Sequence, residues 1–73
     1  MEYTILEKKP WVFAEGCYPT RVVLLKLLGY KEGEYTTHLQ VDATKDGGSI
    51  HLAHGHYFTE LQGALDDFKT REV

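Results

Sequence analysis

The sequence predicts an α+β fold, in which an antiparallel sheet of three to five strands carries a C-terminal helix over 59–71 packed on one face. Short apolar and β-branched runs alternate with breaks that contain Gly or Pro, as in strands joined by turns. The sequence Asp46-Gly47-Gly48 is typical of a hairpin turn. After it, residues 61–68 carry apolar side chains at helical spacing.

Composition predicts one small domain over residues 1–73 with a thin core, for which a homodimer would be a natural way to bury more surface. The formal net charge of −3 includes no basic patch, which argues against nucleic acid as a partner. A single cysteine, Cys17, allows no intramolecular disulfide and suits a reducing compartment. The start does not resemble a signal peptide, and no apolar run is long enough for a membrane span. We therefore expect a cytoplasmic protein that does not bind membranes.

The first strand is expected over 2–7 and is ended by Pro10, which cannot donate to a sheet ladder. Residues 11–13 should dock on the core as a second short strand or an anchored loop. Residues 20–28 allow two interpretations. A proline before them and a glycine after them suit a helix, whereas the pair Val22-Val23 favours a buried strand, which we prefer.

Strands over 35–42 and 49–58 form the predicted hairpin. Four apolar residues should share one of its faces: Leu39, Val41, Ile50 and Leu52. A loop with an even number of residues, such as Asp46-Gly47, meets this requirement. In that register His51 lies across from Asp42.

All four histidines lie in this hairpin: His38, His51, His54 and His56. His54-Gly55-His56 has the spacing that places two imidazoles on one face of a strand, and a zinc or nickel site would need His38 or His51 as a further ligand. The even register turns His38 away from His54 and His56 and disfavours this site. A β-bulge at Gly55 would move His56 to the other face, so a metal site remains the alternative hypothesis.

The C-terminal helix is expected to begin at Thr59, whose hydroxyl would cap it, with Gln62 completing a capping box. Its buried stripe is Leu61, Ala64, Leu65 and Phe68. Asp67 and Arg71 would pair on the exposed side.

Four aromatic residues exceed the needs of so small a core: Trp11, Tyr18, Tyr30 and Tyr57. Exposed aromatics are enriched at protein interfaces. The sequence shows no nucleophile–base signature, and Cys17 is a weak candidate for catalysis. We therefore expect a protein-interaction module and not an enzyme, acting as an adaptor or inhibitor through an exposed sheet face or edge. Its partner would be another protein or a second copy of itself.

One resemblance rests on the end of the chain. Its residues are Tyr35-Thr36-Thr37-His38, Gly55-His56-Tyr57-Phe58, Leu61, Ala64-Leu65 and Asp67-Phe68. This pattern resembles the closing half of small uncharacterised proteins carried by bacterial chromosomes and their mobile elements. The resemblance covers about the last half of the chain and implies no activity or site residue. It suggests a phage or mobile element as the source of the interaction module.

Overall fold

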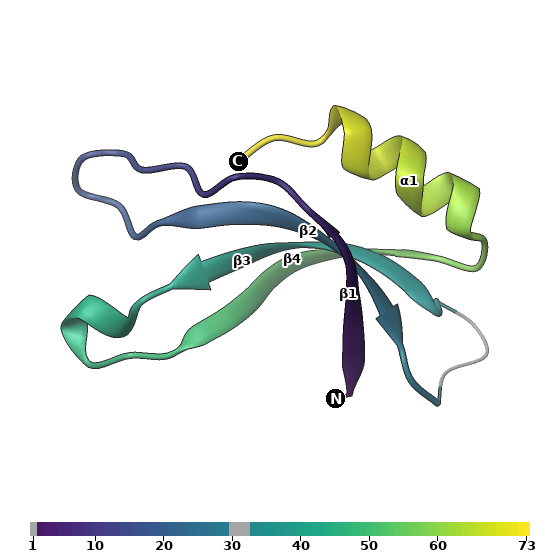
Figure 1. Cartoon of the computed structure of the whole chain (residues 1–73), viewed down its shortest axis with the longest axis horizontal. Helices are drawn as coiled ribbons and strands as arrows, with labels where there is room; N and C mark the ends of the chain where they lie inside the picture. The colour runs from purple at the N-terminus through teal and green to yellow at the C-terminus, as the bar shows by residue number, and fades with distance from the viewer. Residues whose placement is uncertain (1, 30–32) are drawn as a thin grey trace.

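A computed structural model describes residues 2–29 and 33–73. The elements are β1 (Tyr3–Lys8), β2 (Thr20–Leu27), β3 (Tyr35–Asp42), a single 3-10 turn η1 (Thr44–Asp46), β4 (Ile50–Phe58) and α1 (Leu61–Thr70). The four strands form one antiparallel sheet in the order β1-β2-β3-β4. Figure 1 shows α1 lying along one side of this sheet. The predicted α+β fold is confirmed.

The apolar run that allowed two interpretations is a strand. Val22, Val23, Leu24 and Leu25 of β2 are each at most 1% exposed, so both faces of this strand are buried. A strand buried on both faces has no apolar–polar alternation, which is why periodicity could not separate it from a helix. The core of the protein is centred on β2.

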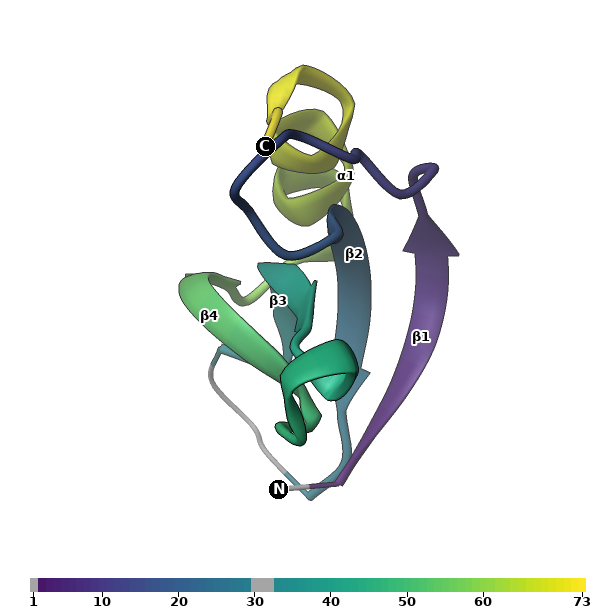
Figure 2. The same cartoon turned by 90° about the vertical axis from the view of Figure 1, so that its left-hand side faces the viewer.

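The two faces of the sheet differ in what covers them. Paired residues on neighbouring antiparallel strands point to the same face, so the row Ile5, Leu25, Thr36 and Tyr57 shares one face. Thr37 points to the other face and is hydrogen-bonded to α1. No described helix covers the Ile5–Tyr57 row, and we call that side the helix-free face. Figure 2 shows the strong twist of the sheet, with β1 and β4 at its two edges.

The predicted register of the β3–β4 hairpin is wrong in the half that lies next to the turn. Asp42 pairs with Ile50 and Val41 with His51, so the connection has an odd number of residues and His51 does not face Asp42. The turn is wider than Asp46-Gly47 alone, because it contains η1 and then Gly47 at φ 78°. The Asp42 carboxylate holds this turn by accepting hydrogen bonds from the amide and hydroxyl of Thr44, at 3.0 and 2.5 Å.

As a consequence, the four apolar residues of the hairpin do not share a face. Leu39 and Val41 lie on the helix side, whereas Leu52 and Ile50 lie on the helix-free face. The predicted rule fails because the centre of the sheet is buried on both faces. Leu39, Val41 and Leu52 are therefore half-buried on one face or the other, whereas Ile50, close to the turn, is 52% exposed.

A β-bulge does occur beside Gly55. Leu39 pairs with Ala53 and Thr37 with His56, so β4 contains one extra residue at His54-Gly55. Past the bulge the pairing is that of the predicted even register, so His38 faces away from His56. The expectation that a bulge would move His56 to the face of His38 is therefore wrong. The left-handed backbone falls on His54, at φ 52°, and not on the glycine.

The segment over 11–13 and the start of the helix also differ in part from the prediction. Residues 11–13 form the anchored loop that was one of the two predicted alternatives, held by a single bridge from Val12 to Thr20. Phe13 is 75% exposed, so this residue does not dock on the core as predicted. The helix begins at Leu61 with Glu60 as N-cap and without a side-chain cap, so the capping role of Thr59 is wrong. Ala64 is fully buried, whereas Leu61 is 40% exposed. Gly63 lets α1 approach β4, because a Cβ there would lie 3.2 Å from Cδ1 of Phe58.

Candidate functional site

The histidines that were candidates for a metal site are spread around the hairpin. His38 lies on the helix-free face, His56 on the helix face and His54 at the bulge. His51 lies near the turn, where its Nδ1 is 3.3 Å from the Ser49 carbonyl. Within residues 2–29 and 33–73, no group of three or more His, Cys, Asp or Glu side chains is placed to hold a metal ion. The geometry therefore gives the zinc or nickel hypothesis no support.

His38 is a buried histidine, 5% exposed. Its Nδ1 lies 2.9 Å from the Thr36 hydroxyl, and its ring meets the Tyr57 ring edge-on at 5.7 Å between centroids. Burial lowers the pKa of His38 from its ordinary value, and the positive charges of Arg71 and His56 lower it further. The neutral form of the imidazole is therefore favoured over the charged form.

Asp67 of α1 points into the sheet and joins two residues there. Its Oδ2 accepts a hydrogen bond from the Thr37 hydroxyl at 2.5 Å and another from Nδ1 of His56 at 3.0 Å. Burial acts to raise the pKa of Asp67. The hydrogen bonds from Thr37 and His56, with the charges of His56 and Arg71, outweigh burial and leave this pKa lowered.

Arg71 completes the same cluster from the end of α1. One guanidinium nitrogen donates to the carbonyl and the hydroxyl of Thr37, at 2.9 Å each, and the other donates to the His54 carbonyl at the bulge. Asp67 and Arg71 thus both face the sheet, and the prediction that they pair on the exposed side is wrong. The Thr37 hydroxyl donates to Asp67 and accepts from Arg71, so it is fully engaged in holding the helix to the sheet. This cluster fastens α1 to the sheet.

The four predicted interface aromatics have different surroundings. Trp11 stacks under the Arg21 guanidinium at 4.4 Å, and Arg21 in turn donates to Gln40 at 2.7 Å. The Tyr18 hydroxyl donates to Asp46 at 2.8 Å. Tyr57, at the edge of the helix-free face, is 60% exposed. Tyr30 lies outside the described residues.

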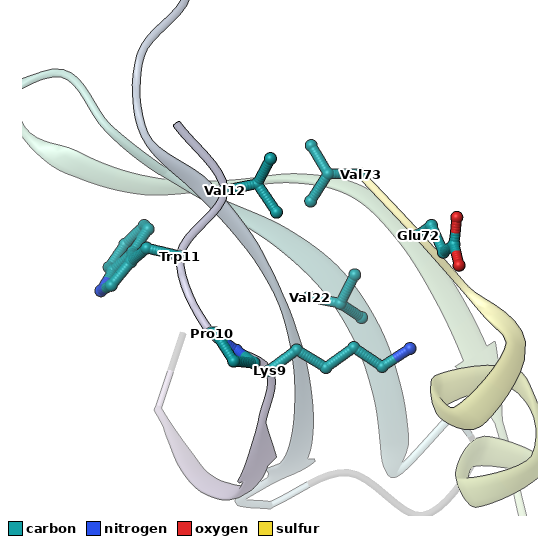
Figure 3. Close-up of a pocket in the computed structure, with 7 residues that line it drawn as sticks. All are labelled: Lys9, Pro10, Trp11, Val12, Val22, Glu72 and Val73. Carbon is teal, nitrogen blue, oxygen red and sulfur yellow. The ribbon is translucent and has the colours of Figure 1, made fainter. Parts of the chain in front are cut away.

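A groove of about 430 Å³ lies between the segment after β1 and the C-terminal residues (Figure 3). It is lined by Lys9, Pro10, Trp11, Val12, Val22, Glu72 and Val73. Figure 3 shows Trp11 pointing away from the valines. The Lys9 ammonium is already hydrogen-bonded to the carbonyls of Lys69 and Arg71, at 3.2 and 2.6 Å. The Lys9 ammonium is therefore already engaged within the protein, and Glu72 is the other charged side chain of the lining.

Cys17 is exposed and lines a second hollow with Gly16, Tyr18, Lys45 and Asp46. None of these residues is a histidine, so the pairing of thiol and imidazole that catalysis would need is not found among them.

The edge strand β1 is an exposed feature that the sequence did not indicate as a binding site. All six of its residues are exposed, and Tyr3, Ile5 and Leu6 are 37%, 37% and 39% exposed. The neighbouring Leu28 is 46% exposed. The run of four apolar or β-branched residues from Tyr3 to Leu6 could have indicated an exposed apolar strand. Only the order of strands in the sheet shows that this strand is an edge.

The backbone of β1 presents hydrogen-bonding groups away from the sheet. The Leu28 amide donates to the Glu2 carbonyl at 3.0 Å, which makes Glu2 and Leu28 a hydrogen-bonded pair. In an antiparallel ladder such pairs alternate with non-bonded ones. Thr4 therefore bonds to β2, while the N–H and C=O groups of Tyr3 and Ile5 point outward. The side chains of these two residues lie on the helix-free face.

The other sheet edge, β4, is less open. Its bulge at His54-Gly55 interrupts the ladder, and the His54 carbonyl is bound by Arg71. Bulges and covering side chains are the usual ways in which an edge is protected against pairing. Among the described strands, β1 thus offers the more regular edge over residues 2–5, up to its own bulge at Leu6.

No known protein family, curated protein or solved structure matches this chain. In the part of the chain that the structure describes, there is no helix of the length and apolar character that a membrane span requires.

Proposed function

We propose that the protein is a non-enzymatic interaction module that binds an extended segment of a protein along β1. The observation that carries this proposal is the outward-facing backbone of Tyr3 and Ile5, flanked by their exposed side chains. An added strand would take up both N–H and both C=O groups. This is the β-augmentation mode of peptide recognition.

The energetics indicate what the partner strand must contain. Each backbone hydrogen bond contributes only about 0.5–1.5 kcal/mol net, so the four outward groups alone give a weak complex. The Tyr3 and Ile5 side chains must therefore also be covered. An aromatic or β-branched residue at alternate positions of the partner would do this, because such cross-strand pairs contribute roughly 0.2–1 kcal/mol each.

A module of this size suits an adaptor or an inhibitor, because it presents one edge and needs no catalytic centre. The fastened helix supports this role. With α1 held to β3 and β4 through Asp67 and Arg71, the sheet is kept in shape and β1 is left open for binding.

The test compares two substitutions at Ile5. Ile5→Pro removes the outward N–H without removing a bond to β2, a position where a sheet edge tolerates proline. Ile5→Ala removes most of the side chain but keeps the N–H. A photoreactive amino acid at Leu28, exposed beside the strand, would report binding in lysate of the source organism.

We expect a cross-linked protein, identified by mass spectrometry, that is lost with Ile5→Pro and weakened but still detected with Ile5→Ala. Circular dichroism and thermal unfolding of both variants must first show the native fold. A cross-link that is unchanged by Ile5→Pro would show that binding does not use the β1 edge.

A further inference from the structure

We propose that the strand added to β1 is β1 of a second copy of this chain, so that two sheets join edge to edge in a symmetric dimer. This inference rests on the function proposed above, and it names the partner of that same edge. It follows from the self-complementarity of residues 2–6.

A two-fold axis perpendicular to the sheet at Thr4 pairs Tyr3 of one copy with Ile5 of the other, twice. These are the residues whose N–H and C=O groups point outward, so both pairs form the hydrogen-bonded type. Their side chains lie on the helix-free face of each copy, and the axis keeps them on one common face. Each pair is then an aromatic residue opposite a β-branched one, a favourable cross-strand combination.

The neighbouring registers are poorer. A shift by two residues in one direction places Ile5 opposite residue 1, which precedes the strand. A shift in the other direction places Tyr3 level with Glu7. The bulge at Leu6 turns Glu7 to the helix side, where it pairs with Leu24, so it cannot cover a tyrosine on the opposite face. The start of the strand on one side and the bulge on the other therefore favour the register centred on Thr4.

Charge is compatible with this arrangement. In the Thr4-centred register Glu2 lies opposite Leu6 of the partner, and Glu7 and Lys8 lie beyond the paired segment. Like charges directly opposite each other would weaken the ladder, and none are opposed among the paired residues 2–6. The contact is short compared with standard dimer interfaces of about 1,200–2,000 Å². A dimer that dissociates on dilution is therefore the expected form.

The first experiment is sedimentation velocity on the purified protein over a concentration series. We expect the mass to rise from 8.4 kDa toward twice that value with increasing concentration. Ile5→Pro should remain monomeric over the whole series. Ile5→Ala, which keeps the outward N–H, should still dimerise but at higher concentration.

The second experiment tests the register by disulfide trapping in a Cys17→Ser background. Thr4 would face Thr4 of the partner as a non-hydrogen-bonded pair, with Cα atoms about 4.5 Å apart, within the range that a disulfide spans. Thr4→Cys should therefore form a covalent dimer in oxidised glutathione. Lys8→Cys is the matched control, because position 8 lies four residues from the axis and its two copies would be roughly 26 Å apart.

The outcomes separate the two proposals. A protein that stays at the monomer mass at every concentration would overturn the dimer. A Lys8→Cys variant that cross-links as fast as Thr4→Cys would overturn the edge-to-edge pairing centred on Thr4. If the purified protein is monomeric but the Leu28 cross-link in lysate still depends on the Ile5 amide, the interaction module stands with another partner. If the purified protein is monomeric and the cross-link in lysate does not depend on the Ile5 amide, both proposals are wrong.

Discussion

Gly55 lies directly against the imidazole of His38 on the neighbouring strand. A Cβ at position 55 would be 2.4 Å from Nε2 of His38, a distance that no relaxed side chain tolerates. The buried histidine of β3 therefore leaves no room for a side chain at position 55 of β4. The glycine provides the space, and the imidazole fills it.

Gly55→Ala should therefore destabilise the protein, by about 1–3 kcal/mol, as expected when a packed site is overfilled. Urea unfolding followed by circular dichroism would measure this. The control is the same substitution in a His38→Ala background, where the opposing ring is gone and the cost of Gly55→Ala should largely disappear. An equal cost in both backgrounds would show that the backbone, and not the imidazole, demands glycine.

His38 should make the free energy of unfolding dependent on pH. Its folded pKa is lowered from the ordinary value of 6.5, so between the two values the unfolded chain binds the proton more readily than the folded one. The stability that neutral His38 contributes is complete above 6.5 and is lost as the pH falls through 6.5 toward the folded pKa. Chemical unfolding at about pH 7.5 and about pH 5.5 would measure this loss.

His38→Gln should reduce the change between these two pH values, whereas His51→Gln, at an exposed position near the turn, should leave it as in the wild type. An unaltered pH profile in His38→Gln would assign the dependence to another group.

Asp67 should also make the free energy of unfolding depend on pH, at lower pH than His38, and again stability should fall as the pH falls. Its folded pKa lies below the ordinary value of 3.8, so its stabilising contribution is present above 3.8 and is lost as the pH falls through the folded value. Asp67→Asn should lower stability at neutral pH and flatten the acid limb of the unfolding curve below about pH 4. Asp66→Asn is the matched control, because Asp66 is exposed on the same helix and accepts from Gln62.

Arg71 should be irreplaceable by lysine. Its guanidinium binds Thr37 and the His54 carbonyl at once, and a single ammonium cannot reproduce this fork. Arg71→Ala should cost about 1.5–3 kcal/mol, the range for hydrogen bonds to charged groups, and Arg71→Lys should recover little of it. Thermal unfolding would measure both. Lys69→Ala, an exposed neighbour, should change stability by less than about 0.5 kcal/mol.

The absent helix cap gives a stabilising prediction. Glu60 occupies the N-cap position with extended backbone angles, φ −118° and ψ 141°, but its side chain makes no capping bond. Glu60→Ser should supply one and stabilise the protein by about 0.5–1 kcal/mol, which raises Tm by several degrees in a domain of this size. Thr59→Ala should be nearly neutral. A large loss with Thr59→Ala would restore Thr59 as the cap.

The sequence alone determined the local elements. The turn-forming residues, the β-branched runs and the apolar stripe at 61–68 are local signals, and they placed four strands and the helix correctly. It also indicated Gly55 as the position where a bulge would alter the hairpin, although the preferred register contained none.

The tertiary structure decided the register and the direction in which polar side chains point. The turn half of the hairpin is shifted because Asp42 binds Thr44 and because both faces of the central strands are buried, so no single apolar face selects the pairing. Asp67 and Arg71 turn toward the sheet because they find hydrogen-bond partners there. Asp67 binds Thr37, 30 residues away in sequence, and Arg71 binds the His54 carbonyl, 17 residues away. Such choices depend on the summed contacts of distant segments, which local patterns do not contain. The open edge of β1 is of the same kind, because a strand becomes an edge only through its place in the sheet.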